Sequence, residues 1–297
     1  MEPNAEALKG QVREFWNRGS CDTHAAVSGK FTRAYFEEIE AYRYYDQPFI
    51  HGFAQFTRYF DKRVLEVGFG AGTDFIQWLR AGARASGVDL TQEGLANLTH
   101  RIQVYGIPQP EKIMVADAEA LPFESNSFDL GYSFGVLHHS PDTEKAVGEL
   151  VRVIRPGGEL KIMLYNSRSI CALNAWVKHA LLRGRPWKPA SWALWHHVES
   201  VGTKAYTQNE LRRMLSTLPL RDIRVHTELT SADTLASSSF LPLNWLYRAA
   251  IHLAGYRPGW RIEAFQQKGV LPAQGGEVEF SGHRLGWFHC ISARKTG

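Results

Sequence analysis

The chain has 297 residues, of which 44% are hydrophobic and 22% are charged, and this balance excludes a disordered or fibrous protein. A net charge of +4 without a long lysine or arginine run argues against a broad phosphate-binding face, and no nucleic-acid partner is expected. The three cysteines, Cys21, Cys171 and Cys290, form no CxxC pair, which disfavours a disulfide framework and a zinc site. The charged N-terminus lacks the apolar stretch of a secretory signal, and we expect a cytoplasmic protein.

Residues 1–60 are rich in aromatic side chains, several of them three or four positions apart, and this spacing predicts helices. One interpretation is an aromatic helix face that packs on a central sheet. The other is a lid over a ligand. In the second interpretation Arg43 and Tyr44 contact an anionic substrate or a cofactor carboxylate, because the fork of an arginine suits a carboxylate.

The most informative segment is VLEVGFGAGTD, residues 64–74, where an apolar run predicts a buried strand followed by a glycine loop and a helix. Gly68, Gly70 and Gly72 give the spacing GxGxG. A loop that binds the pyrophosphate of a dinucleotide needs its third glycine at the position where this chain has Thr73. The spacing therefore disfavours a dinucleotide. A loop whose glycines serve only the turn remains the simplest alternative.

The chemistry of this loop suits a ligand that carries both an ammonium and a carboxylate. Glycines let a ligand approach the backbone, and the N–H groups at the start of the next helix favour a carboxylate. Glu66 in the strand and Asp74 in the first helical turn add acids that meet a cationic amine. The methionine end of S-adenosylmethionine has both groups.

Strands and helices then alternate along the chain. The predicted elements are a strand at 85–89, a helix at 90–105, and strands at 112–116 and 128–134, followed by a helix at 143–154 and a strand at 159–165. Ligands of open α/β sheets bind at the carboxyl ends of such strands. Asp89 is placed there to accept two ribose hydroxyls, and Asp117 to accept from an adenine amino group.

Taken together, these segments resemble the class I S-adenosylmethionine-dependent methyltransferases, within them the type 11 group that includes ubiquinone/menaquinone-biosynthesis-like enzymes. The matching motifs are VLEVGFGAGTD, GVDLT, DAEALPFESNSFD, SFGVLHH and ELVRVIRPGGELKIMLYN, over roughly residues 64–166. One departure is Phe69, where many members have a cysteine, and it leaves the backbone role intact. The resemblance implies S-adenosylmethionine as cofactor, S-adenosylhomocysteine as product, and no metal. The cofactor-binding residues that it implies are Glu66, Gly68, Gly70, Gly72, Asp74, Asp89, Leu90, Asp117, Ala118 and Ser133.

The implied fold is an α/β Rossmann-like sheet, mostly parallel with an antiparallel last strand, under a largely helical cap. The expected division is an N-terminal helical cap segment (1–60), a cofactor-binding core (61–166), a helical cap insertion (167–206), a core helix and strand (207–229), a second cap insertion (230–284) and the last core strand (285–297). Apolar stripes at 171–182 and 241–256 predict amphipathic helices that are too short or too interrupted to span a membrane. One interpretation is that such helices bury their apolar stripes within the cap or in a homodimer interface. The other is that they enclose a lipid-like substrate or touch a membrane surface.

His138 and His139 follow the fourth strand, close to the expected position of the reacting methyl group. Methyl transfer to a hydroxyl or a carbon acid needs a base, and a histidine titrates in the right range. These two residues are therefore the catalytic candidates, with a structural role as the alternative. Substrate-binding candidates, besides Arg43 and Tyr44, are Tyr165, His196 and His197, with Glu199 beside the last two.

The predicted function is methyl transfer to an oxygen or carbon of a small, partly apolar molecule in biosynthesis. One alternative is a protein that binds S-adenosylmethionine, or scaffolds a partner, without turnover. The other is an NAD-dependent oxidoreductase, which the glycine spacing disfavours. A homodimer and a peripheral membrane contact remain open.

Overall fold

The structure, a computed structural model, describes residues 4–233, 266–273 and 276–297. The helix expected at 241–256 lies outside these residues. Among the described residues, no helix is long and apolar enough to cross a membrane.

A single nine-stranded sheet forms the centre of the described fold, in the order β3-β2-β1-β4-β5-β9-β6-β8-β7. Strands β1 to β6 and β8 share one direction, and β9 and β7 run antiparallel to their neighbours. The mostly parallel sheet with an antiparallel last strand is confirmed. The strands are β1 (Arg63–Val67), β2 (Arg84–Asp89), β3 (Lys112–Val115), β4 (Phe128–Phe134), β5 (Ile154–Tyr165), β6 (Leu220–Glu228), β7 (Gln266–Ala273), β8 (Gly276–His283) and β9 (Phe288–Lys295).

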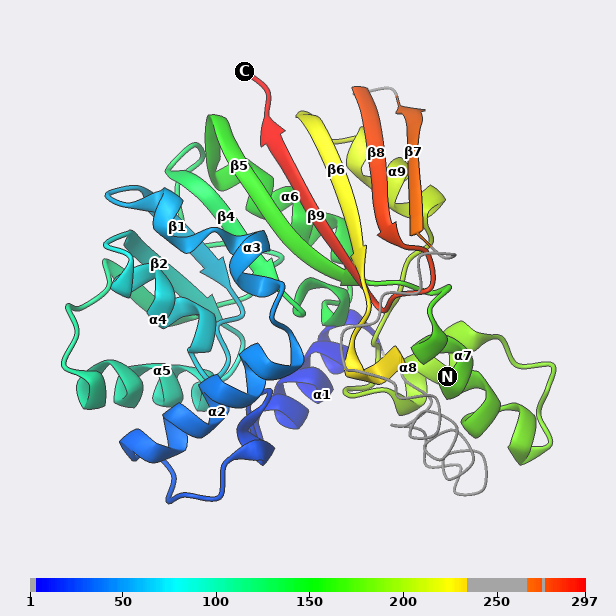
Figure 1. Cartoon of the computed structure of the whole chain (residues 1–297), viewed down its shortest axis with the longest axis horizontal. Coiled ribbons are helices and arrows are strands. Elements are labelled where there is room, and N and C mark those ends of the chain that lie inside the picture. The colour runs from blue at the N-terminus through cyan, green and yellow to red at the C-terminus, as the bar shows by residue number, and fades with distance from the viewer. Residues whose placement is uncertain (1–3, 234–265, 274–275) are drawn as a thin grey trace, which may run out of the picture.

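Helices cover both faces of this sheet, and others gather below it (Figure 1). In this view α4 and α5 lie in front of the parallel strands and α6 and α9 behind the sheet, while α1 lies below the carboxyl ends of the strands. The helices are α1 (Ala5–Asn17), α2 (Arg33–Asp46), α3 (Ile50–Ala54), α4 (Thr73–Arg80), α5 (Gln92–Tyr105), α6 (Thr143–Val153), α7 (Ile170–His179), α8 (Ala190–His197) and α9 (Gln208–Ser216).

The alternation of β1 explains why helices cover both faces. Val64 points to one face, where it belongs to a cluster with Trp78 of α4. Leu65 points to the other face and joins a cluster that contains Leu150 of α6 and Leu215 of α9. A parallel strand that is apolar on both sides needs cover on both sides, as the helices here provide.

Two helices have clear caps. Thr207 and Glu210 form the capping box of α9, in which each side chain bonds the backbone of the other residue. The side chain of Thr91 caps α5, whose other end is Gly106 in the left-handed conformation.

The structure differs from the sequence prediction in two parts of the sheet. Strands β7 and β8 extend the sheet within the segment 230–284, which was expected as a cap insertion. Strand β5 begins at Ile154, before the turn residues Pro156 to Gly158, because its pairing with β4 skips from Ile154 to Glu159. Residues 155–158, which lie between the expected helix and the expected strand, are therefore an interruption of register within one strand.

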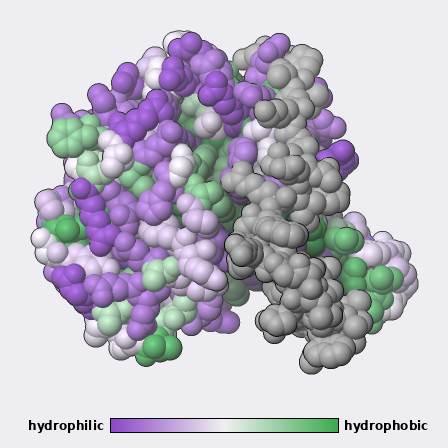
Figure 2. Space-filling view, viewed as in Figure 1, coloured by the Kyte–Doolittle hydropathy of each residue, from purple (hydrophilic) through white to green (hydrophobic). Residues whose placement is uncertain are grey.

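An apolar area lies at the surface of the cap around α7. Figure 2 shows hydrophobic residues at the lower right of the molecule, beside the grey atoms. The exposed large apolar side chains of this region are Leu173, Leu181, Leu182 and Trp187.

Candidate cofactor and active site

A cavity of about 340 Å³ opens at the carboxyl ends of β1, β2, β4 and β5. The glycine loop after β1, the loops after β2 and β3, and the turn after β4 form its floor. Helix α1 and residues 20–24 add a wall from the N-terminal segment, and Trp287 and Phe288 add one from the start of β9. The cavity therefore lies where ligands of open α/β sheets bind.

The glycine loop has a conformation that other residues rarely adopt. Gly68, Gly70 and Gly72 have φ angles of +81°, +50° and +75°. A Cβ atom at Gly68 would overlap the side chain of Val136, and one at Gly72 would lie 2.8 Å from Leu98 Cδ1. Gly68 and Gly70 line the cavity, whereas Gly72 packs against α5. The first two glycines therefore serve the ligand side and the third serves helix packing.

Asp89 at the end of β2 holds the glycine loop and faces the cavity. Its Oδ2 accepts the Gly70 N–H at 2.8 Å, and its Oδ1 accepts the N–H and hydroxyl of Thr91 at 2.9 and 2.6 Å. Burial raises the pKa of this carboxyl group. A carboxylate has about four lone-pair sites, which leaves capacity for ligand hydroxyls. Asp89 and Leu90 both line the cavity, where the sequence prediction needs them.

Asp117 and Ala118 also line the cavity, and Lys9 of α1 contacts the acid. Lys9 Nζ lies 2.6 Å from Asp117 Oδ2 and 3.3 Å from Glu119 Oε2. Burial opposes the charge of Lys9, but these carboxylates raise its pKa above the usual value. Sequence reasoning missed Lys9, since nothing in α1 alone marks one lysine as the partner of a loop more than a hundred residues away.

Asp74 is already paired within the protein. Arg43 of α2 binds it with two hydrogen bonds, Nε to Oδ1 at 2.9 Å and Nη2 to Oδ2 at 2.7 Å. The hydroxyls of Tyr44 and Tyr132 donate to it at 3.1 and 2.8 Å. Although burial opposes its charge, the arginine holds the pKa of Asp74 below the usual value. Both Asp74 and Arg43 line the cavity, and their pairing ties α2 to the glycine loop.

Glu66 lies beside this pair at the end of β1. It is buried, lines the cavity and accepts the indole N–H of Trp78 at 2.7 Å. Burial raises its pKa well above the usual value. Asp74 is paired with Arg43, whereas Glu66 has no ion-pair partner among the described residues.

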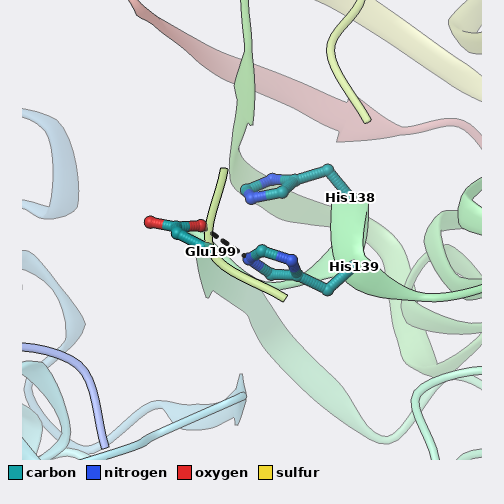
Figure 3. A group of neighbouring side chains, drawn as sticks. All are labelled: His138, His139 and Glu199. Atoms are coloured by element: carbon teal, nitrogen blue, oxygen red, sulfur yellow. Dashed lines mark ion pairs between the residues drawn. The ribbon is translucent and has the colours of Figure 1, made fainter. Parts of the chain in front are cut away.

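In a separate cluster, His138, His139 and Glu199 come together (Figure 3). His139 Nε2 lies 3.1 Å from Glu199 Oε2, and the His139 Nδ1 atom is within 3.0 Å of the Ser200 hydroxyl. The Tyr165 hydroxyl donates to both carboxylate oxygens of Glu199 at 3.0 Å. His139, Tyr165 and Glu199 line the cavity.

His138 differs from its neighbour. It is fully buried, and burial lowers the pKa of its ring well below the usual value, which keeps it neutral. Its ring packs on Tyr165 with 3.8 Å between centroids. His138 does not line the cavity; it lies behind His139 and Glu199, which do.

Several predicted residues lie behind the cavity wall or away from it. The Ser133 hydroxyl donates to Val67 O at 2.8 Å and supports the end of β1. The His196 ring lies 2.9 Å from Trp192 O, and His197 stacks on His179. The predicted residues that are not among the lining residues described are Tyr44, Gly72, Ser133, His138, His196 and His197.

Comparisons with known proteins agree with this geometry. A family model described as a methyltransferase domain matches residues 65–162. Methyltransferase GfsG of Streptomyces halstedii is 33% identical over 102 residues, which are 34% of this chain and 36% of the relative. A phosphatidylethanolamine N-methyltransferase of Cereibacter sphaeroides is 32% identical over 121 residues, 41% of this chain and 59% of the relative. The chain thus matches between about a third and three fifths of the length of these relatives.

Among solved structures, the chain is similar to geranyl diphosphate C-methyltransferase from Streptomyces coelicolor A3(2), with a TM-score of 0.56 and 15% identity. The similarity covers 99% of this chain and 100% of that one, and at this identity it speaks for the fold alone. The strand-end cavity and the matched segment coincide. Residues 65–162 match the model of a methyltransferase domain.

Proposed function

We propose that this protein transfers a methyl group from S-adenosylmethionine to an oxygen or carbon atom of a small, partly apolar molecule. The observation that carries the proposal is one cavity whose lining combines two chemically different sets of residues. The first set is the glycine loop with the acids that suit the cofactor. The second set is a group of aromatic and apolar side chains with the His139–Glu199 pair.

The glycine loop and the neighbouring acids fit the groups of S-adenosylmethionine. Gly68 and Gly70 expose backbone to the cavity, and Glu66 is available for the ammonium of the methionine part. Asp89 retains lone pairs for the ribose hydroxyls, and Asp117 is available to the adenine amino group. When bound, the cofactor supplies a methyl group on a positively charged sulfur.

The apolar part of the lining favours an apolar molecule with one acidic hydroxyl or carbon. The apolar lining residues include Trp16, Phe134, Met163, Trp287 and Phe288. Such walls exclude water and orient the acceptor, which supplies much of the rate of a displacement at carbon.

The proton of the acceptor goes to the His139–Glu199 pair. As the acceptor atom forms its bond to the methyl carbon, the bond from that carbon to sulfur breaks, and the sulfonium charge disappears. The Tyr165 hydroxyl holds the Glu199 carboxylate toward the cavity. We therefore assign Glu199 a role in catalysis beside His139, with a contribution of the size usual for general base catalysis, about 100-fold or more.

The location and partners follow from the same proposal. We place the reaction in the cytoplasm and in the biosynthesis of a small molecule, and we propose that no metal is needed for cofactor binding. The membrane contact and the homodimer stay predictions. The exposed apolar side chains around α7 suit either one equally.

The test is a product assay with purified protein, methyl-labelled S-adenosylmethionine and acceptors grouped by nucleophile: phenols, carboxylic acids, carbon acids and amines. The expected result is labelled product from apolar hydroxyl or carbon acceptors, with equal release of S-adenosylhomocysteine. Product from amines alone would overturn the assignment of the acceptor atom. Tight binding of S-adenosylhomocysteine without product from any group would favour the alternative of a binding protein.

A further inference from the structure

The cluster of His138, His139 and Glu199 has the composition of a metal site. We propose that it binds one divalent transition metal ion of the zinc class, with its open coordination position toward the cavity. Two histidines and one glutamate are a donor set that zinc uses in catalytic sites, where a fourth position stays open for water or substrate. The ligand atoms of the three residues all lie within 4.8 Å of one another.

The two histidines converge in a way that their local backbone does not require. They are consecutive residues of a short 3₁₀ helix, Leu137–His139. With about three residues per turn, consecutive side chains on such a helix point roughly 120° apart. Here the two ring centroids are nonetheless 4.3 Å apart. The rings turn toward the same point, and Figure 3 shows the Glu199 carboxylate facing that point from the opposite side.

Nitrogen atoms of the two histidine rings remain free to bind a metal ion. Both ring nitrogens of His138 are buried and have no hydrogen-bond partner among the described residues, and the Nε2 of His139 has only the Glu199 carboxylate beside it, at 3.1 Å. A buried polar atom without a partner costs free energy, and natural structures seldom retain one without a reason. His138 is 0% exposed, so water does not satisfy it from outside. A bound metal ion would use one nitrogen of each ring.

The backbone at Glu199 supports the same inference. Glu199 has a φ angle of +56°, in the left-handed region that non-glycine residues seldom adopt. Such strain persists where the surrounding structure imposes it, and it concentrates at functional sites. Here it presents the carboxylate to the two rings and to the cavity.

The site must contract to bind zinc. Bonds of about 2.1 Å in tetrahedral geometry place ligand atoms about 3.4 Å apart, which is less than the widest separation here. Glu199 has the freedom to move, because its side chain is 33% exposed while that of His139 is 5% exposed. The ligand His139 is oriented by the Ser200 and Thr203 hydroxyls at its Nδ1, the kind of outer contact that metal-binding histidines use.

The use of this ion rests on the proposed function. A hydroxyl of the acceptor that enters the open position would lose its proton more easily, because a bound zinc ion lowers the pKa of an oxygen ligand. With the ion bound, His139 and Glu199 are ligands and no longer take the proton, so the proton of the acceptor hydroxyl passes to solvent water. The oxygen keeps the electron pair that attacks the methyl carbon. Binding of the metal itself does not depend on this step.

The test compares His138→Phe with His100→Phe. Phenylalanine keeps a ring of similar shape on Tyr165 and removes only the nitrogens. His100 provides the matched control, since its ring stacks on Phe31 with 4.1 Å between centroids. The full chain is stripped with chelator, titrated with Zn²⁺ in a calorimeter, and titrated with Co²⁺ while the visible spectrum is recorded.

We expect one equivalent of Zn²⁺ and a Co²⁺ spectrum of low coordination number in the wild type and in His100→Phe. His138→Phe should weaken Zn²⁺ binding by at least about 100-fold, since loss of even an outer contact of a ligand costs 10–100-fold. Equal Zn²⁺ affinity in wild type and His138→Phe, or no stoichiometric binding in the wild type, would overturn the inference. Titration of the same samples with S-adenosylhomocysteine reports separately on the proposed function.

Discussion

The substitution Gly68→Ala tests whether the backbone of the glycine loop contacts the cofactor. Gly68 has a φ angle of +81° and lines the cavity. A Cβ atom there would overlap the side chain of Val136, which lines the same cavity. The substitution therefore adds backbone strain, and it also forces a displacement at the ligand site.

Gly106→Ala separates the two effects. Gly106 also has a positive φ angle, +61°, but a Cβ atom there meets nothing within 4 Å. A non-glycine residue in the left-handed conformation costs about 1–2 kcal/mol, and both variants should lose that much stability. Overpacking at Gly68 should cost about 1–3 kcal/mol more. Because every 1.4 kcal/mol is about tenfold in affinity, a comparable distortion of the site weakens S-adenosylhomocysteine binding by about tenfold or more.

Denaturant unfolding and calorimetric titration measure the two quantities. Gly68→Ala should lose both stability and affinity, while Gly106→Ala should lose stability alone. Adding Val136→Ala to Gly68→Ala should recover part of the stability, because the two nearest atoms to the new Cβ are the Val136 methyl groups. Equal affinities of the two single variants would refute the contact between loop and cofactor.

Three further predictions concern charged groups. Lys9→Met should lower the free energy of unfolding by about 3 kcal/mol, because it leaves the buried Glu119 carboxylate without its cation and also removes the ion pair with the partly exposed Asp117. The exposed Lys30→Met should cost less than about 1 kcal/mol in the same denaturant assay. Glu199→Gln should reduce turnover about 100-fold or more and leave the affinity for S-adenosylhomocysteine nearly unchanged. The control is Glu228→Gln, which removes a carboxylate 3.1 Å from His226 outside the cavity and should leave turnover unchanged. Equal turnover in both glutamine variants would remove Glu199 from the mechanism. Burial lowers the pKa of Lys161 to about 8 in the folded protein, below the value near 10.5 in the unfolded chain. Between these two pH values the unfolded chain binds more protons than the folded protein, so the free energy of unfolding rises with pH. Relative to Lys161→Met, the unfolding free energy of the wild type should increase by up to about 3 kcal/mol over that pH interval. A difference between the two proteins that stays constant with pH would contradict the lowered pKa of Lys161.

Local patterns predicted the core elements well. The strand expected at 128–134 is β4 with the same bounds, and the helix expected at 143–154 is α6, Thr143–Val153. These signals depend on neighbouring residues alone: an apolar run, a cap and a glycine stop. For the same reason the sequence placed Asp89 and Asp117 at one edge of the sheet.

The cap depends on contacts that no local pattern contains. Glu199 and Lys9 reach the cavity from segments far along the chain from the glycine loop, and no local pattern indicates how close they come to it. Strand β8 did carry a signal. Buried Val278 and Phe280 alternate with exposed Glu277 and Glu279, the pattern of a half-buried strand, although the segment was expected to belong to the cap.

The most direct test of the account is calorimetric titration of the purified protein with S-adenosylhomocysteine, with NAD in parallel. The account predicts binding of S-adenosylhomocysteine with a dissociation constant in the micromolar range, about −8 kcal/mol, and no binding of NAD. Loss of that binding in Asp89→Ala, with the fold retained, would locate the ligand at the end of β2. Binding of NAD alone, or of neither ligand by the folded protein, would contradict the assignment of the cavity to S-adenosylmethionine.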